Sequence, residues 1–151
     1  MKIVLFQPQI PQNTGNIVRT CSVTGSSLIL IPPLGFSIDD KSLKRAGLDY
    51  WENVPVEIEE NLDEVIKKYY PRIFFFTSKG KNSLYDIKFQ PDDVLVFGAE
   101  THGLPNYVHD QYYDNCVRIP ILKEARCLNL ATSVGIGVYQ AFQHFPDKLE
   151  L

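Results

Sequence analysis

Short apolar runs alternate along this chain with segments of helical periodicity, and that alternation limits the fold more than any other feature. The apolar runs are rich in β-branched and aromatic residues and predict strands at Lys2–Gln7, Ser27–Ile31, Arg72–Thr77, Val94–Gly98 and Cys116–Ile119. The segments between and after them predict helices near Asn13–Thr24, Asp40–Ala46, Leu62–Tyr70, Pro105–Tyr112 and Asn129–Phe142. Because the strands are apolar almost throughout, we expect both faces of the sheet to be buried. The pattern predicts an α/β fold with a mainly parallel sheet flanked by helices.

The position of a ligand site follows from that fold. Open parallel sheets bind their ligands beyond the carboxyl ends of the strands. The loops after Phe76, Phe97 and Ile119 are therefore the places where we expect a site.

Length and composition narrow the class of protein. With 151 residues, 44% of them hydrophobic, the chain is long enough for one core, and we expect a single domain over residues 1–151. The net charge of −3 argues against binding nucleic acid by bulk electrostatics alone, so an RNA site would need a local basic patch or an oligomer. We expect no membrane segment and no signal peptide. Three cysteines without a CxxC pair predict neither a disulfide framework nor a metal site, and favour a cytoplasmic location.

The first polar segment, Pro8–Arg19, follows a predicted strand and opens a helix. Asn13 or Thr14 is expected to cap that helix, and Gly15 would let a partner approach the backbone. The free N–H groups of the first turn, with Arg19 further along, are typical of a phosphate or ribose clamp. An ordinary cap with a solvated Arg19 explains the same residues equally well.

A second segment, Val94–Pro105, carries a buried strand into a turn with two glycines. Gly98 and Gly103 permit tight backbone bends, and Glu100 stands between them. Glu100 either holds a ribose hydroxyl or a cationic group, or serves only as a cap. No partner for His102 lies at metal-ligand spacing, and we interpret it as an exposed loop residue.

A third segment, Arg118–Ala131, leaves a strand through a proline, continues as a basic loop and ends where Asn129 is expected to cap the last helix. It fits a backbone-lined adenine or ribose pocket beside a basic edge, or a plain helix cap. Cys127 is a poor candidate for a nucleophile because no histidine lies near it in the sequence.

The segment Asp39–Trp51 mixes basic and aromatic residues. Such a mixture is typical of a nucleic-acid contact surface. It is equally consistent with a solvated helix whose Tyr50 and Trp51 belong to the core, and both interpretations stay open.

Taken in order, the segments IPQNTGNIVRTC, FGAETHGL and RIPI with RCLNLATSVGIGVYQA resemble the three motifs of the SPOUT superfamily of RNA methyltransferases. The resemblance extends over nearly the whole chain and is strongest to the minimal tRNA ribose 2'-O-methyltransferases that act on the wobble nucleotide. Three positions differ from the usual pattern of that family. Cys127 and Ala131 stand where serine is common, and His102 stands where arginine is common.

The resemblance implies a C-terminal trefoil knot that holds S-adenosylmethionine. The cofactor-binding positions that it implies are Phe76, Thr77, Gly98, Ile119, Cys127 and Leu128. It also implies a homodimer that binds the tRNA anticodon stem-loop, with basic candidates at Lys44, Arg45, Lys79, Lys81 and Arg126. No metal is implied.

For the chemistry, the resemblance points to Arg19 as the leading catalytic residue, with the site shaped by Asn13, Glu100 and Asn129. Because a guanidinium is not deprotonated in proteins, we expect Arg19 to bind the adjacent phosphate rather than to act as a base. Tyr139 is the alternative proton acceptor.

Other functions also fit parts of the pattern. One is an RNA-binding protein on this fold that does not transfer a methyl group. A second is methylation of ribosomal RNA, although larger relatives with that role usually carry an additional RNA-binding domain. A flavodoxin-like nucleotide binder fits the alternation of elements but not the three ordered motifs.

Overall fold

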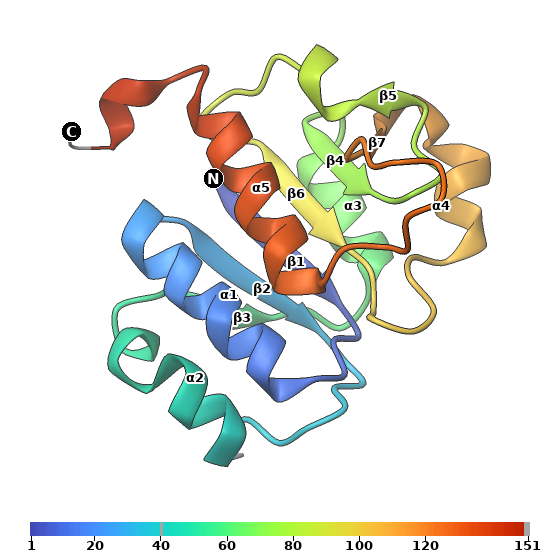
Figure 1. Cartoon of the computed structure of the whole chain (residues 1–151). Helices are drawn as coiled ribbons and strands as arrows, with labels where there is room; N and C mark the ends of the chain where they lie inside the picture. Colours follow the sequence, from blue (N-terminus) through green and yellow to red (C-terminus); the bar gives the residue numbers. More distant parts are fainter. Residues whose placement is uncertain (40, 150–151) are drawn as a thin grey trace.

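A parallel sheet with helices on both faces forms the centre of the molecule (Figure 1). The structure is a computed structural model that describes residues 1–39 and 41–149. In these residues the sheet has seven strands in the order β3-β2-β1-β6-β4-β7-β5, and every pair of neighbours is parallel. Their bounds are β1 Lys2–Phe6, β2 Ser27–Ile31, β3 Val56–Ile58, β4 Ile73–Phe76, β5 Asn82–Ser83, β6 Val94–Phe97 and β7 Cys116–Arg118. The predicted α/β class is confirmed.

The helices lie where the periodicity predicted them, with shifted ends. Their bounds are α1 Pro11–Thr24, α2 Lys41–Trp51, α3 Leu62–Tyr69, α4 Asn106–Gln111 and α5 Leu130–Phe142. Short 3-10 turns occupy Leu84–Asp86, Tyr113–Asn115 and Pro146–Lys148. The start of the predicted helix at Asp40 and the side chain of Lys44 lie outside the described residues, as do the side chains at 42 and 47–49.

Alternating strand residues separate the core into two layers. Ile3 and Leu5 of β1 pack on the side of α1 and α5, whereas Val4 packs on the side of α3 and α4. All residues of β4 and β6 and the middle residues of β1 and β2 are buried, so neither face of the central sheet is exposed to solvent. Figure 1 shows α1 and α5 side by side on one face, with α2 packed outside α1. The expected burial of both faces is confirmed.

Two of the strands were not predicted from the sequence. β3 is only three residues long, and two of the three are exposed. β5 consists of Asn82 and Ser83, which have no apolar signal, and it exists because it pairs with β7 at the edge of the sheet. Tertiary pairing rather than local propensity forms both strands.

The predicted cap of the first helix is wrong. α1 begins at Pro11, its N-cap is Ile10, and no side chain caps it there. Asn13 and Thr14 are buried inside the first turns of the helix instead. Proline suits this start because it has no N–H that needs a partner and its φ is already helical.

The expected close approach to the backbone at Gly15 is observed, and the partner is a neighbouring helix. A Cβ built on Gly15 would lie 2.3 Å from the Cβ of Ala46, so the glycine lets α1 and α2 pack in close contact. The close approach at this position is therefore by a helix and not by a ligand.

No helix in the described part of the chain is long and apolar enough to cross a membrane. The trefoil knot stays a prediction that the resemblance implies.

Candidate functional site

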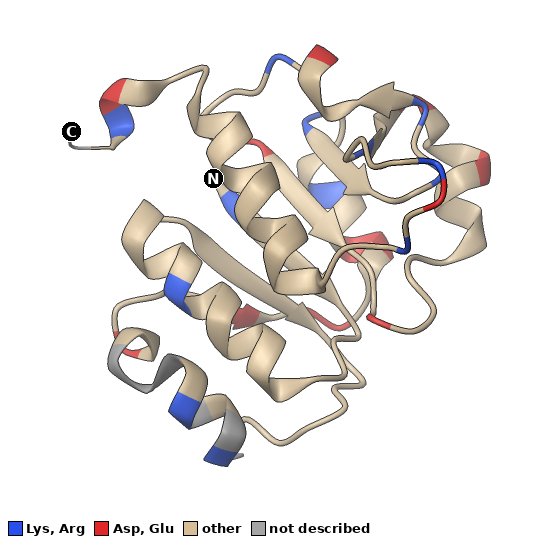
Figure 2. Cartoon of the chain, in the orientation of Figure 1, with Lys and Arg blue, Asp and Glu red and all other residues tan. Residues whose placement is uncertain are grey.

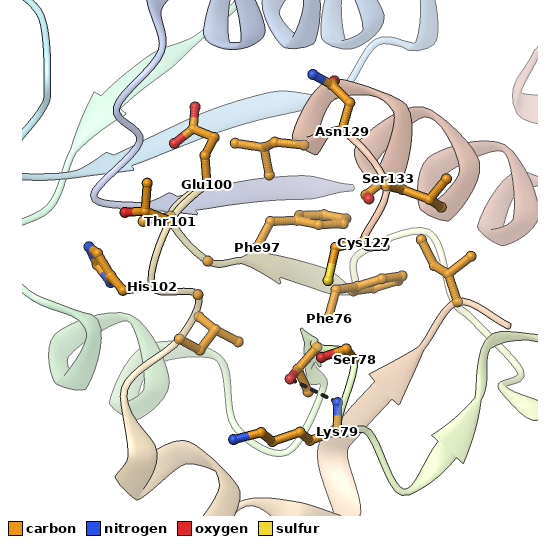
Figure 3. A pocket seen from close by; sticks show the side chains of 18 of the residues that line it. Phe76, Ser78, Lys79, Phe97, Glu100, Thr101, His102, Cys127, Asn129 and Ser133 are labelled. Carbon is orange, nitrogen blue, oxygen red and sulfur yellow. Dashed lines mark hydrogen bonds between the residues drawn. The ribbon is translucent and has the colours of Figure 1, made fainter. Parts of the chain in front are cut away.

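A pocket of about 540 Å³ lies at the carboxyl ends of β4, β6 and β7, in the place predicted from the strand order (Figure 3). Its lining includes all six residues proposed from the resemblance as cofactor contacts, namely Phe76, Thr77, Gly98, Ile119, Cys127 and Leu128. The rings of Phe76 and Phe97 stack with their centroids 4.5 Å apart and form an apolar wall. A volume of this size matches a small organic ligand.

The loop after β6 forms one side of the pocket and depends on its two glycines. Gly103 has a φ of +66°, a conformation that a side chain disfavours. A Cβ on Gly98 would lie 2.3 Å from the carbonyl carbon of Gly103. Two backbone hydrogen bonds between Ala99 and Gly103 close the turn. This tight bend was predicted from the sequence, and it places Glu100 at the mouth of the pocket.

A chain of hydrogen bonds joins the three motifs at the pocket. Asn129 caps α5, because its Oδ1 accepts from the backbone N–H groups of Ala131 at 2.9 Å and Thr132 at 3.3 Å. Its Nδ2 donates to Oδ1 of Asn13 at 2.9 Å, and Nδ2 of Asn13 donates to Oε1 of Glu100 at 3.2 Å. The predicted cap at Asn129 is confirmed, and these motif residues meet in space.

The carboxylate of Glu100 binds the start of α1. Its two oxygens accept from the backbone N–H groups of Gln9 at 2.7 Å and Ile10 at 2.9 Å, in addition to Asn13. The side chain of Gln9 completes the link, since its Oε1 accepts from the N–H and the hydroxyl of Thr101. Glu100 therefore ties the loop after β6 to the residues at the start of α1, and it also lines the pocket. Its expected contact with a ribose hydroxyl or a cationic group stays a prediction.

Arg19 and Tyr139 are not among the described residues that line the pocket. Both are exposed, Arg19 on α1 and Tyr139, at 55% exposure, on α5. Arg19 lies eight residues beyond Pro11, which is about 12 Å along a helix. The structure therefore brings Asn13, Glu100 and Asn129 together and leaves the other two catalytic candidates outside the pocket of their own chain.

Several residues of the pocket were not proposed as cofactor contacts. The hydroxyl of Thr77 is 2.9 Å from Nε2 of His109 on α4, and it also accepts from the N–H of Lys79 at 3.3 Å. His109, Ser78 and Ser133 line the pocket as well. A histidine in the middle of a predicted helix gave no signal, because its role comes from packing α4 against the loop after β4.

The basic candidates for RNA contact are dispersed over the surface (Figure 2). Lys79 lines the pocket, whereas Lys81 forms an ion pair with Asp114. Arg126 is exposed on the loop between β7 and α5, and Arg45 is exposed on α2. His102 is exposed at the rim of the pocket, as predicted, with its ring against that of Phe6.

The three cysteines differ in their surroundings. Cys21 and Cys116 are buried, and burial raises the pKa of Cys21 to about 12 and that of Cys116 to about 11. Cys127 is exposed, and its sulfur is directed into the pocket (Figure 3). Among the described residues no group of three or more potential ligands could hold a metal ion.

The fold and the site together define a class: an α/β protein that holds a small organic ligand beyond the carboxyl ends of parallel strands. The SpoU rRNA Methylase family matches residues 1–139 of the chain, so this protein belongs to that family. The resemblance drawn from the three motifs is confirmed.

Individual relatives of the chain have names that are more specific than the family description. The chain is 46% identical over 143 residues to the tRNA (cytidine(34)-2'-O)-methyltransferase of Methylovorus glucosotrophus, with 93% of each chain covered. The enzyme of the same name from Saccharophagus degradans is also 46% identical over 143 residues, again with 93% of each chain covered. A solved structure concerned with the 2-OH methylation of C/U34 on tRNA has a TM-score of 0.89 and 40% identity, and covers 97% of this chain and 96% of its own.

Proposed function

We propose that this protein is an S-adenosylmethionine-dependent methyltransferase that acts on the ribose 2'-hydroxyl of the wobble nucleotide of tRNA, a cytidine or a modified uridine. One observation carries the proposal. The three motifs meet at a single pocket, and all six expected cofactor contacts line it, in a chain 46% identical to tRNA (cytidine(34)-2'-O)-methyltransferases. We expect one domain to carry the activity, and to act in the cytoplasm, where tRNA is present.

The pocket fits the cofactor in size and in chemistry. Its volume of about 540 Å³ and the stacked pair Phe76 and Phe97 suit a flat aromatic base. Polar groups of Ser78, Lys79 and Ser133 surround this apolar wall and can bind hydroxyl, amino and carboxylate groups. When bound, S-adenosylmethionine would supply the methyl group of its sulfonium: the methyl–sulfur bond would break as the ribose 2'-oxygen takes the methyl group and loses its proton, and S-adenosylhomocysteine would leave.

Within one chain, the cluster of Asn13, Glu100 and Asn129 shapes the pocket. Glu100 already accepts three hydrogen bonds, two of them from the backbone at the start of α1. These bonds occupy both carboxylate oxygens and tie the loop after β6 to the residues at the start of α1. We therefore assign Glu100 and the two asparagines to positioning rather than to proton transfer.

Arg19 is exposed on α1 and is not among the residues that line the pocket of its own chain. We propose that the protein is a homodimer in which Arg19 of one protomer faces the pocket of the other. There its guanidinium binds the phosphate next to the target ribose and lowers the pKa of the 2'-hydroxyl electrostatically. Tyr139, exposed on the same face, is the candidate for receiving the proton.

The face formed by α1 and α5 supports this dimer. α5 contains no charged residue, and the only charged residue of α1 is Arg19 (Figure 2). Val23, Ile136 and Tyr139 are 56%, 37% and 55% exposed on these helices. Depletion of charge around exposed apolar and aromatic side chains is typical of the centre of a protein interface.

The proposal is tested with methyl-labelled S-adenosylmethionine and unmethylated bulk tRNA, followed by digestion and mass spectrometry of the nucleosides. We expect label in 2'-O-methylcytidine or in a 2'-O-methyluridine derivative from the wobble position. Label in a methylated base would refute the ribose chemistry. Cofactor binding without any transfer to tRNA would favour ribosomal RNA as the substrate, or a binding protein without activity.

A further inference from the structure

Arg19 lies over an aromatic ring from a neighbouring helix. Its Cζ is 4.9 Å from the centroid of the Tyr50 ring, a cation–π distance. Arg19 is exposed on α1, whereas Tyr50 on α2 is half-buried and packs against the main core cluster. The guanidinium therefore rests on a ring that is held by the core.

The close packing of α1 and α2 fixes the ring beside the arginine. Gly15 brings the helices so near that a Cβ there would lie 2.3 Å from Ala46 and 3.0 Å from the carbonyl oxygen of Leu43. Trp51, next to Tyr50, packs against the same core cluster. Four residues after Gly15, Arg19 comes one turn further along the same side of α1 and reaches Tyr50.

The contact uses only one part of the guanidinium. A guanidinium that stacks on a ring through its flat face keeps its five N–H donors pointing outward in the plane of the fork. The donors thus remain available for a phosphate. An exposed arginine without such support loses more side-chain freedom when it binds, which weakens its binding.

We propose that Tyr50 is a positioning residue for Arg19: its ring holds the guanidinium in the orientation that presents the fork to the RNA phosphate. This inference rests on the proposed function, in which Arg19 contacts that phosphate. It also gives the segment Asp39–Trp51 a role that the sequence left open. Its aromatic end contributes to the site by supporting Arg19 and not by stacking on RNA.

Two substitutions at Tyr50 separate the ring from the hydroxyl. Tyr50→Phe keeps the ring, and we expect kcat with tRNA to stay near the wild-type value. Tyr50→Leu removes the ring, and we expect kcat to fall about three- to tenfold, the range that a cation–π contact supports. The affinity for S-adenosylmethionine stays unchanged in both variants, because Tyr50 does not line the pocket.

Tyr69→Leu is the matched control. Tyr69 also has a cation over its ring, Lys68 at 5.3 Å, but it lies on α3 on the other face of the sheet. We expect this variant to keep its kcat. Fluorinated phenylalanines at position 50 give a second series that preserves the shape of the ring and weakens only its attraction for a cation. We expect kcat to fall as fluorines are added.

The decisive comparison uses Arg19→Ala. If Tyr50 acts through Arg19, then Tyr50→Leu causes no further loss in the Arg19→Ala background. An equal loss in both backgrounds, or a flat fluorination series, would overturn the role of Tyr50 and leave that of Arg19 intact. Full activity of Arg19→Ala itself would instead refute the proposed function of Arg19, and with it this inference.

Discussion

The pocket cluster and the pair Arg19 and Tyr139 differ in what holds them. Asn13, Glu100 and Asn129 are joined by hydrogen bonds of 2.9 Å and 3.2 Å within one chain and to the backbone of two helix starts. Arg19 and Tyr139 are exposed on α1 and α5, and Arg19 is supported by a ring from α2. One part of the site is thus complete in a single chain. The other part faces outward and, in the proposed dimer, meets the pocket of the partner.

This difference predicts that cofactor binding and methyl transfer can be altered separately. Binding of the cofactor should depend on the pocket of one chain, whereas methyl transfer should depend on residues of two. The largest expected effect follows from removing the outward-facing cation, the guanidinium of Arg19. We expect Arg19→Ala to lower kcat by about 100- to 1000-fold, as loss of an electrostatic contact at a reacting centre does. Its affinity for S-adenosylmethionine, measured by calorimetry, should equal that of the wild type. A large loss of cofactor affinity would contradict the division between the two parts.

Asn13 tests the part of the site that one chain builds. In Asn13→Ala, both Glu100 and Asn129 lose a partner, so we expect the protein to be less stable by about 1–3 kcal/mol. Cofactor affinity should fall as well, because the loop after β6 and the start of α5 are no longer joined. Denaturant unfolding and calorimetry measure the two effects. Gln12→Ala, an exposed change one residue earlier, is the control and should alter neither.

Cys127 reports directly on occupancy of the pocket. Its thiol is exposed and lines the pocket, whereas Cys21 and Cys116 are buried with raised pKa values. Because the thiolate is the reactive form, a maleimide should modify Cys127 in preference to the other two. We expect S-adenosylmethionine to slow this labelling in the wild type and equally in Arg19→Ala. Labelling at an unchanged rate with saturating cofactor would place the ligand elsewhere.

The smallest expected effect concerns stability at high pH. Burial raises the pKa of Cys21 from 9.0 to about 12, so the folded state keeps a proton that the unfolded chain releases. The contribution of this proton to the free energy of unfolding is fully present below pH 9.0 and is lost as the pH rises toward 12. The expected slope is about 1.4 kcal/mol per pH unit for each such thiol.

Unfolding experiments above pH 9.0 should therefore show a smaller decline with pH in Cys21→Ala than in the wild type. Cys127→Ala, which removes an exposed thiol, is the control and should decline like the wild type. Parallel curves for wild type and Cys21→Ala would show that the buried thiol does not titrate as described.

The sequence allowed the sheet centre and the pocket to be predicted for a simple reason. A continuous apolar run in the sequence indicates a strand that is buried on both faces. Ligands of an open parallel sheet bind beyond the carboxyl ends of its strands, and this locates the site. The short edge strands β3 and β5 could not be predicted, since pairing with neighbours forms them. The start of α1 was misplaced because the carboxylate that binds its backbone, Glu100, lies about 90 residues away in the chain.

The same limit applies to Gly15 and to His109. A glycine next to a predicted helix cap indicates that some partner approaches the backbone, but the sequence does not show that the partner of Gly15 is α2. A histidine inside a helix has no local signature, and only the packing of α4 brings His109 to Thr77. Resemblance to the family pointed to six positions that line the pocket, but it did not reveal that Arg19 lies outside that lining.

Mixing two inactive variants tests most directly whether Arg19 acts across the dimer. Arg19→Ala keeps its pocket, and Leu128→Trp is chosen to fill the pocket while keeping Arg19. In a mixed dimer the intact pocket of the first chain faces Arg19 of the second, so we predict that co-refolding the two variants restores methyl transfer to tRNA. Each variant alone should stay inactive. A mixture that forms mixed dimers but remains as inactive as its components would show that Arg19 does not act across the dimer.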